Sequence, residues 1–444
     1  MNAINRQMHM GVFVLSTGNH TAGWRYEGAA TSHIELPVIQ EIARIAGRGK
    51  FDLLFISDAM VMDPTDHPSF MCRFEPTTLI SVLSASTSHI GLGATVSTSF
   101  SEPFNVARLF SSIDHISAGR AAWNVVTSSN PKAALNFNRD EHLEHALRYQ
   151  RANEFVDVVR GLWDCWDDGA IVADKTTGQF IDESKVRALD HKGRFFQVKG
   201  AVNISRSPQG HPVIIQAGGS PSGLELAART ADVVFSVVQD LQAAKIAYAD
   251  LKGRMTKYGR SPDELAVLPG VMPIIGTSDA EARETLSKLQ SWLTPANAAT
   301  LVASRIGYDV SGHPLDGPVP PPPPSQGSQA FSHVLYETAR REKMTLRDLY
   351  NLTAAARGHW VLCGTPSGIA DTLEEWFVGA AADGFNVLPP YFPGAFADFV
   401  DLVVPQLQRR GCFRRDYQGT TLRDHLSLAG VPAPVPRRSA VGSA

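Results

Sequence analysis

The sequence has few cysteines and no long apolar or basic segment, and each scarcity excludes a class of protein. Its four cysteines are far apart and form no CxxC pair, which argues against a disulfide framework or zinc cluster and favours a reducing, cytoplasmic location. These are Cys72, Cys165, Cys363 and Cys412. No apolar run approaches the ~20 residues that span a membrane, and the first residues lack the pattern of a signal peptide. A net charge of −3 without a basic block argues against nucleic acid as a partner.

Several motifs that define common enzyme classes are also missing. No GxGxxG turn follows the first predicted strand, as an open dinucleotide-binding sheet would require. No Gly-Lys-Ser/Thr of a P-loop and no GxSxG of an α/β-hydrolase occurs. The acidic residues are scattered without a distinctive pair, so no glycosidase carboxylates are assigned.

What is present is an ordinary globular composition, 43% hydrophobic and 19% charged, with strands and helices in alternation. Eight strands are predicted, at 8–15, 51–56, 90–96, 121–126, 211–216, 232–238, 265–275 and 384–388. Helices are predicted at 34–46, 76–87, 104–116, 141–163, 221–230, 241–258, 279–292 and 366–382. Most of the strands are apolar on both faces, which favours a closed parallel (β/α)8 TIM barrel, an α/β fold, over an open doubly wound sheet.

We expect one barrel domain over residues 1–426, with insertions after strands four and seven. The first insertion, about 165–210, is polar and irregular with short strands. The second, about 293–360, contains five consecutive prolines, Pro320 to Pro324, a stiff polyproline II spacer if not a mere linker. We interpret it as a mobile lid over the barrel mouth. Residues 427–444 are predicted to be a flexible tail, or one draped over a neighbouring subunit.

Asn124 stands out because it places an amide in the middle of the apolar strand 121–126. A buried amide without partners costs about 1–3 kcal/mol, so it needs either a backbone partner or a ligand. Barrel enzymes of this type place their sites at the carboxyl ends of the strands. Small polar residues follow Asn124 at such an end, which favours a ligand. Asp58 and the segment Thr95 to Thr98 lie at other strand ends.

The segment QAGGSPSG, residues 216–223, joins the fifth strand to a helix. Unpaired N–H groups at a helix N-terminus make a site for phosphate, to which Ser220 can add its hydroxyl. The alternative is ordinary capping by Ser220, with Pro221 in the first turn.

His142, His145 and Tyr149 are predicted to lie on the helix 141–163. His142 and His145 could hold a metal, but no third ligand is evident and we predict no metal site. His145 and Tyr149, four residues apart, share a face and could reach a bound ligand together, or form a plain surface pair.

Five long stretches together resemble one family. They are GRAAWNVVTS (119–128), LNFNRDEHLEHALRYQRANEF (135–155), QAGGSPSGLELAARTADVVF (216–235), GTPSGIADTLEEWF (364–377) and DGFNVLPPYFPGAFADFVDLVVPQLQRRG (383–411). They resemble the flavin-dependent monooxygenases of the nitrilotriacetate monooxygenase component A type, in the bacterial luciferase-like superfamily. The segment 133–137 departs from the family's usual spelling, and the first loop, GNHTAGWRYEG, is near the family's usual His and Trp-Arg pattern without deciding the substrate. These loops shape the substrate pocket, so the substrate stays open.

The resemblance implies a barrel that uses reduced FMN (FMNH2) from a separate NAD(P)H:flavin reductase, with O2, to oxygenate a small organic substrate. Expected reactions are C–N or C–S cleavage, hydroxylation or heteroatom oxidation. The implied FMN contacts are Asp58, Thr95, Thr98, Asn124, His145, Tyr149, Gly219 and Ser220. Asn124, His145 and Tyr149 are also the implied catalytic residues, and His20 is a candidate for contact with substrate or oxygen.

The family also implies a homodimer or homotetramer. Two alternatives stay open within the superfamily, a deazaflavin-dependent hydride-transfer enzyme and a non-catalytic flavin-binding protein.

Overall fold

The computed structural model describes residues 6–64, 66–294, 302–303, 306, 308–310, 312–321 and 330–431. Eight parallel strands close into a barrel, in the order β9-β11-β1-β2-β3-β4-β7-β8 and back to β9. They are β1 His9–Phe13, β2 Leu53–Ile56, β3 Gly91–Ser97, β4 Ala121–Val126, β7 Val213–Gln216, β8 Val233–Ser236, β9 Ala266–Ile275 and β11 Gly384–Val387. The predicted TIM barrel is therefore confirmed, and the open sheet is wrong because β8 pairs with β9.

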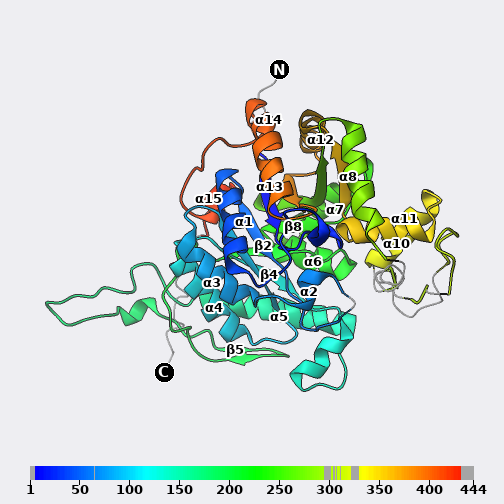
Figure 1. Ribbon diagram of the computed structural model, residues 1–444. Coiled ribbons are helices and arrows are strands. Elements are labelled where there is room, and N and C mark those ends of the chain that lie inside the picture. Colours follow the sequence, from blue (N-terminus) through cyan, green and yellow to red (C-terminus); the bar gives the residue numbers. More distant parts are fainter. Residues whose placement is uncertain are drawn as a thin grey trace.

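The helices surround the strands as an outer layer (Figure 1). The main helices that follow barrel strands are α1 Leu36–Arg48, α3 Pro76–Ser86, α4 Pro103–Ile116, α5 His145–Trp163, α6 Pro221–Thr230, α7 Leu241–Arg254 and α8 Asp279–Ser291, and α12 Pro366–Val378 precedes β11. The others are α2 Pro68–Met71, α10 Ala330–Arg341, α11 Leu346–Ala356, α13 Gly394–Asp398, α14 Val404–Arg409 and α15 Leu422–His425, with a π-helical turn Phe399–Val403 between α13 and α14. No described helix is long and apolar enough to cross a membrane.

Three residues lie differently from the prediction, and α12 ends at Val378, four residues before its predicted end. Ile34, expected on the buried face of the first helix, precedes α1 and is exposed. Val82, expected to face inward, is exposed on α3. Helix α5 begins at His145, four residues later than predicted, so His142 lies in the loop before it. In each case apolar spacing located the helix but did not define which residue starts it or which face is buried.

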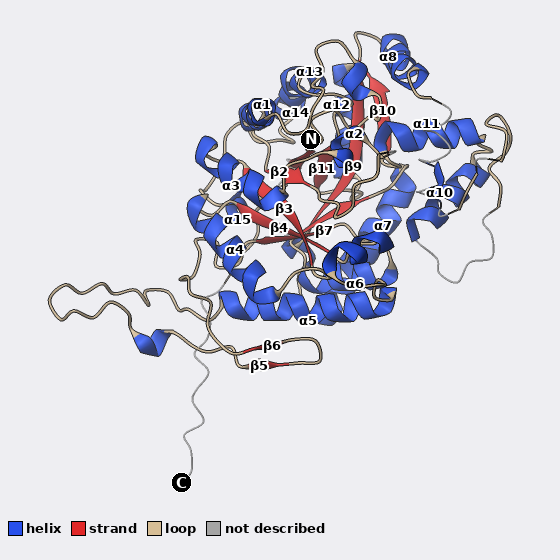
Figure 2. Ribbon diagram, turned by 60° about the horizontal axis from the view of Figure 1, so that its bottom comes forward, coloured by secondary structure: helices blue, strands red, loops and turns tan. Residues whose placement is uncertain are grey.

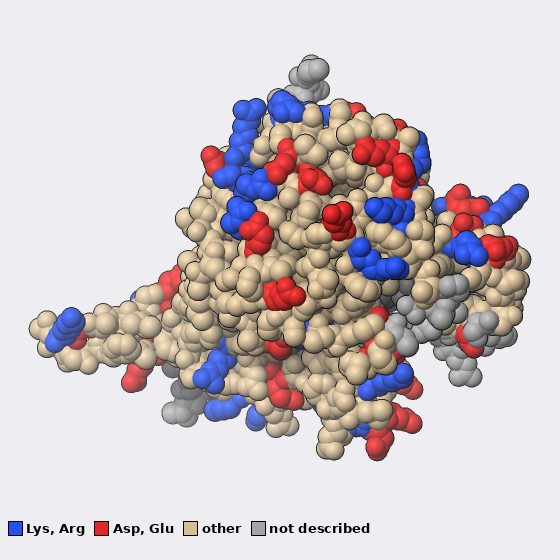
Figure 3. Space-filling view, in the orientation of Figure 1, with Lys and Arg blue, Asp and Glu red and all other residues tan. Residues whose placement is uncertain are grey.

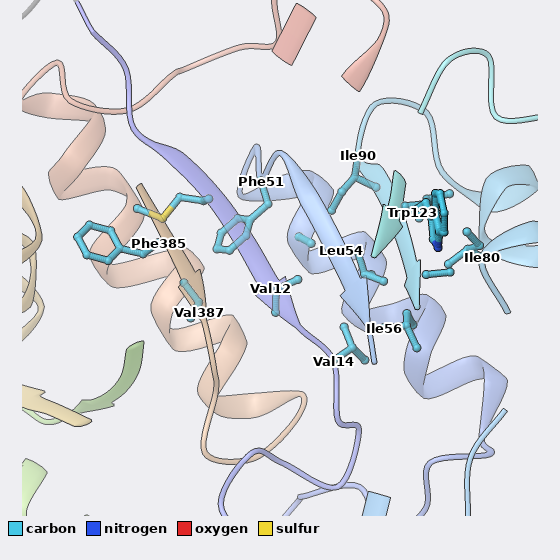
Figure 4. Packing of buried hydrophobic residues seen from close by; sticks show 14 of the residues in the cluster. Val12, Val14, Phe51, Leu54, Ile56, Ile80, Ile90, Trp123, Phe385 and Val387 are labelled. Carbon is cyan, nitrogen blue, oxygen red and sulfur yellow. The ribbon is translucent and has the colours of Figure 1, made fainter. Parts of the chain in front are cut away.

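Alternate residues of the strands form two separate cores. Val12, Leu54, Trp123 and Phe385 point out of the barrel and pack under the helices (Figure 4). Side chains of the other parity, including Phe13, Phe55, Ala122, Ile215 and Phe235, fill the barrel interior. Asn124 has the parity of Ala122, so its amide lies inside the barrel, one layer nearer the carboxyl ends of the strands.

A ninth strand, β10 Trp360–Gly364, was not predicted. It pairs in parallel with the second half of β9, from Val271 to Ile275, outside the barrel. The predicted second insertion ends at Trp360. The ten-residue β9 is long enough to close the barrel with its first half and to carry β10 on the rest.

The first insertion forms a projecting arm, which we define as residues 166–186 (Figures 1 and 2). Bridges between Trp166 and Val186 and between Ile171 and Ile181 make it a hairpin. A second hairpin, β5 His191–Lys192 with β6 Gln197–Val198, follows it. On the face shown in Figure 3, acidic and basic side chains are interspersed rather than gathered by sign.

The second insertion is only partly described. Pro320 and Pro321 are described, but the rest of the proline run lies outside the described residues, as does the tail from residue 432. Helix α11 lies against the loop after β1, where the Thr21 backbone N–H and hydroxyl both donate to the Ala354 carbonyl, at 2.9 and 3.1 Å. This part of the insertion therefore borders the carboxyl ends of the strands.

The C-terminal segment closes the opposite end of the barrel with buried ion pairs. Arg414 contacts Asp52 at 2.5 Å, and Arg423 contacts Asp232 at 2.9 Å. Burial alone would raise the pKa of Asp52, but Arg414 and His9 together hold it below its usual value. These pairs anchor the chain's last helix beneath β2 and β8.

Candidate flavin site

Asn124 and Thr95 form a polar pair inside an otherwise apolar barrel. They are register partners on β4 and β3, and Asn124 Nδ2 donates to Thr95 Oγ1 at 2.8 Å. Thr95 Oγ1 in turn donates to the carbonyl of Ile56, at 3.0 Å. Asn124 is 3% exposed, and its Oδ1 has no hydrogen-bond partner among the described residues. The amide is thus half satisfied internally, and an acceptor atom is left for something else.

The loop between β7 and α6 lies next to Asn124. Ile215 is the register partner of Asn124 on β7, and Gly218 follows it by three residues. Ser220 is the N-cap of α6, its Oγ accepting from the Gly223 N–H at 3.1 Å. The capping interpretation is therefore confirmed. It leaves the hydroxyl proton of Ser220 and the other N–H groups of the first turn for a ligand.

Tyr149 reaches this same loop from α5. A Cβ atom added to Gly218 or to Gly223 would lie 3.0 Å from the Tyr149 hydroxyl oxygen. A Cβ on Gly219 would meet nothing within 4 Å, so this residue borders open space. Small residues are needed here because any side chain at 218 or 223 would displace the tyrosine. The salt bridge of Arg229 on α6 to Asp157 on α5, at 2.7 Å, holds the two helices together.

His145 lies beside Tyr149, with ring centroids 4.9 Å apart, as the four-residue spacing predicted. It is exposed as the first residue of α5, where partial burial and then the nearby charge of Arg148 lower its pKa. Arg148, which sequence analysis did not select, adds a positive charge near the start of the same helix. His142 is not on this helix and its Nε2 is within 2.6 Å of the Ser128 carbonyl. Among the described residues, no three His, Cys, Asp or Glu side chains are grouped to hold a metal ion.

Three predicted site residues remain, Asp58, Thr98 and His20. Asp58 lies two residues beyond Ile56 and is therefore close to the Thr95 side; burial raises its pKa, against the opposing effect of Arg73. Thr98 is fully buried, and its hydroxyl donates to the Val126 carbonyl at 3.1 Å. His20 forms no hydrogen bond with the Asn124 group within the described residues. It lies in the loop after β1, fully buried, with its Nε2 lacking a partner among the described residues.

Two further buried amides have an unpaired atom within the described part of the chain. Gln216 Nε2 lies at the end of β7, and Asn386 Oδ1 lies on β11. Neither was selected from the sequence. An amide in an apolar strand is the signal that identified Asn124, and it would have identified Asn386 in the strand GFNV as well.

Comparisons with known proteins identify the family. A family model described as luciferase-like monooxygenase matches residues 8–384. The chain belongs to this family. It is 46% identical over 432 residues to an N-acetyl-S-(2-succino)cysteine monooxygenase of Bacillus subtilis (strain 168), covering 96% of this chain and 98% of that protein. It is 45% identical over 440 residues to nitrilotriacetate monooxygenase component A of Aminobacter aminovorans, covering 96% and 97%.

Solved structures show the same fold. DmoA of Hyphomicrobium sulfonivorans superposes with a TM-score of 0.86 at 30% identity, over 95% of this chain and 92% of that one. A riboflavin lyase determined with modified FMN and riboflavin superposes with a TM-score of 0.83 at 27% identity, over 96% and 97%. These matches confirm the family resemblance and the enzyme class, an oxidoreductase that incorporates oxygen.

Proposed function

We propose that this chain is the oxygenase component of a two-component system. It binds FMN in the reduced form, received from a separate NAD(P)H:flavin reductase, and uses O2 to oxygenate a small organic substrate. When bound, the reduced flavin supplies two electrons, so that one oxygen atom enters the substrate and the other leaves as water. The products of C–N or C–S cleavage, hydroxylation or heteroatom oxidation all fit this balance.

The observation that carries the proposal is the unpaired Oδ1 of Asn124. Its Nδ2 already donates to Thr95 Oγ1, so a flip of the side-chain amide would break that hydrogen bond. The free atom is an acceptor and calls for an N–H donor, which the isoalloxazine ring of a flavin offers. The reduced ring carries an N–H at N5 that the oxidised ring lacks. A buried acceptor therefore favours the reduced form if the ring lies against β3 and β4.

The phosphate of the cofactor belongs at the start of α6 in this proposal. Ser220, the N–H groups of the first turn and the Tyr149 hydroxyl are donors, and Arg148 contributes positive charge nearby. The open space at Gly219 leaves room for the group. His145 and Tyr149 then bind the cofactor's phosphate end, while Asn124, Thr95 and Asp58 hold its ring.

The test is an anaerobic titration of the purified chain with oxidised and reduced FMN, followed by rapid mixing with oxygenated buffer. We expect tighter binding of reduced FMN, and in N124A a loss of about three- to tenfold in that affinity, the effect of one hydrogen bond. N203A, which alters an exposed asparagine before β7, is the control. Equal binding of both FMN forms, or N124A with unchanged affinity, contradicts the proposal, and a deazaflavin cofactor would be tested next.

A further inference from the structure

A second cluster of polar side chains lies in the loops after β1 and β2, apart from the Asn124 pair. We define the cationic cluster as Arg73, Arg357, His20, His33 and His67. Arg357 comes from the end of α11, so the second insertion completes it. Both guanidinium groups lie over the ring of Phe70, with the central carbon of Arg73 at 4.3 Å and that of Arg357 at 5.6 Å from the centroid.

The donors in this cluster are only partly used. Arg73 donates from Nη1 to the Ser57 carbonyl at 2.8 Å, while its Nε and Nη2 are buried without partners among the described residues. No carboxylate in the described part of the chain forms an ion pair with Arg73 within 4.0 Å. Asp58 and Asp66 are its nearest acidic influences and act only through space. Burying a guanidinium group with only part of its N–H groups hydrogen-bonded costs free energy. A planar anion with two acceptor oxygens, such as a carboxylate, would pair with Nε and Nη2 of Arg73 together.

The histidines present the same pattern. His20 and His67 each accept a backbone N–H at Nδ1, from Ala22 and Ser69, both at 3.1 Å. His33 Nδ1 accepts from the Ser16 N–H at 2.9 Å. With Nδ1 as the acceptor, a neutral ring must carry its proton on Nε2. All three Nε2 atoms are buried and unpaired within the described residues, so each is a donor without an acceptor.

Arg73 and the three histidines thus hold buried N–H groups that have no acceptor among the described residues. Arg357 adds positive charge beside them, with one N–H donated to Asn19 Oδ1 at 3.3 Å, and the charges of Arg357, Arg73, His20 and His33 all act on His67. Resting on the proposed function, we propose that the cationic cluster is the subsite for a carboxylate of the substrate, so that the enzyme oxygenates an organic acid. Arg73 would engage the carboxylate in a bidentate fashion, with the histidine Nε2–H groups as further donors. The flavin ring against β3 and β4 would then face the rest of the substrate.

The test is calorimetric titration of the full chain with tricarballylate, a small tricarboxylate, and with its uncharged triamide. We expect tricarballylate to bind and the triamide not to bind. R73Q should weaken tricarballylate binding about tenfold or more, as expected for a charge-assisted pair, and R73K should fall between R73Q and the unmodified chain. R108Q, which alters an exposed arginine on α4, is the matched control and should change nothing. If R73Q does not fold, R357Q replaces it.

Two outcomes overturn the proposal. One is the absence of tricarballylate binding, or equal binding by the unmodified chain and R73Q. The other is that R73Q weakens binding of FMN but not of riboflavin, which would mean that the cluster holds the cofactor's phosphate. Failure of the proposed function is distinguishable, because reduced FMN would then fail to bind while tricarballylate binding and its loss in R73Q persist.

Discussion

The buried histidines of the cationic cluster make acid stability a sharp test of the structure. Burial holds the pKa of His20 at about 3, and burial followed by the charge of Arg73 holds that of His33 at about 3 as well. In an unfolded chain the same side chains titrate near 6.5. Between these two values the unfolded state binds more protons than the folded state. Stability is therefore full above pH 6.5 and is lost as the pH falls below it.

The size of the loss at pH 5 depends only on the unfolded pKa, provided that the folded pKa is well below 5. Each histidine held neutral then costs about 2 kcal/mol of unfolding free energy relative to neutral pH, from the standard linkage relation. His20 and His33 together cost about 4 kcal/mol, a large share of the roughly 5–15 kcal/mol that stabilises a typical protein. His67, whose pKa is also lowered by burial, acts in the same direction.

The assay is urea unfolding of the flavin-free chain at pH 7.5 and pH 5, followed by tryptophan fluorescence and circular dichroism. H20Q should lose about 2 kcal/mol less than the unmodified chain on going to pH 5, whatever its stability at neutral pH. Carboxylates contribute equally to both proteins and cancel in the comparison. H115Q, which alters an exposed histidine of α4, should keep the full loss. An H20Q loss equal to that of the unmodified chain would refute the neutral, unpaired state of His20.

Three other predictions concern the proposed phosphate site at Ser220, the ion pair between Arg423 and Asp232, and the projecting arm. S220A should weaken FMN binding by about 1 kcal/mol and leave riboflavin binding unchanged. S278A, which removes the N-cap hydroxyl of α8, is the matched control. Equal effects of S220A on both ligands would contradict the phosphate assignment. R423M should lower the free energy of unfolding in urea by about 3–5 kcal/mol, because it leaves the buried Asp232 carboxylate without its ion-pair partner. D232N/R423M, which removes both charges, should recover part of that loss. An unchanged urea midpoint in R423M would contradict the role of this pair. Phe180 is 65% exposed on the projecting arm, next to the exposed Ile171 and Val172, and we propose that this apolar surface contacts a second copy of the chain. In sedimentation velocity the unmodified chain and T176A, altered at the exposed polar tip, should then form an oligomer, and F180S should shift toward monomer. A monomeric unmodified chain, or an F180S oligomer as stable as that of the unmodified chain, would contradict this contact.

The barrel could be predicted from the sequence because its signals are local. Each of the eight strands is a short apolar run bounded by polar or turn residues, and each helix between them has apolar residues at helical spacing. Strand β10 was not predicted, and the reason is physical. It pairs only with the free second half of β9, and the half-buried run WVLCG carries no signal that separates a strand from the end of the insertion before it.

The residues of the two candidate sites also differ in whether the sequence could identify them. Asn124 could be found because an amide in an apolar strand is locally inconsistent, and its register partner Thr95 follows from the order of the strands. Arg73 and Arg357 could not be found, since they are nearly three hundred residues apart and neither conflicts with its own segment. Only the fold shows that both guanidinium groups lie over Phe70.

Two groups of unpaired atoms at the carboxyl ends of the strands also explain how one barrel can serve many substrates. The Asn124 group is built from β3, β4 and β7, where neighbouring strands hold each residue in register and allow little variation. The cationic cluster is built from the loops after β1 and β2 and from α11, which can change without disturbing the barrel. If the first group holds the flavin and the second holds the substrate, altering Arg73 lowers the affinity for the substrate's carboxylate more than the affinity for reduced FMN, on which Arg73 acts only through the charge of Asp58. That separation is the main chemical consequence of the architecture, and the paired measurements on N124A and R73Q measure it directly.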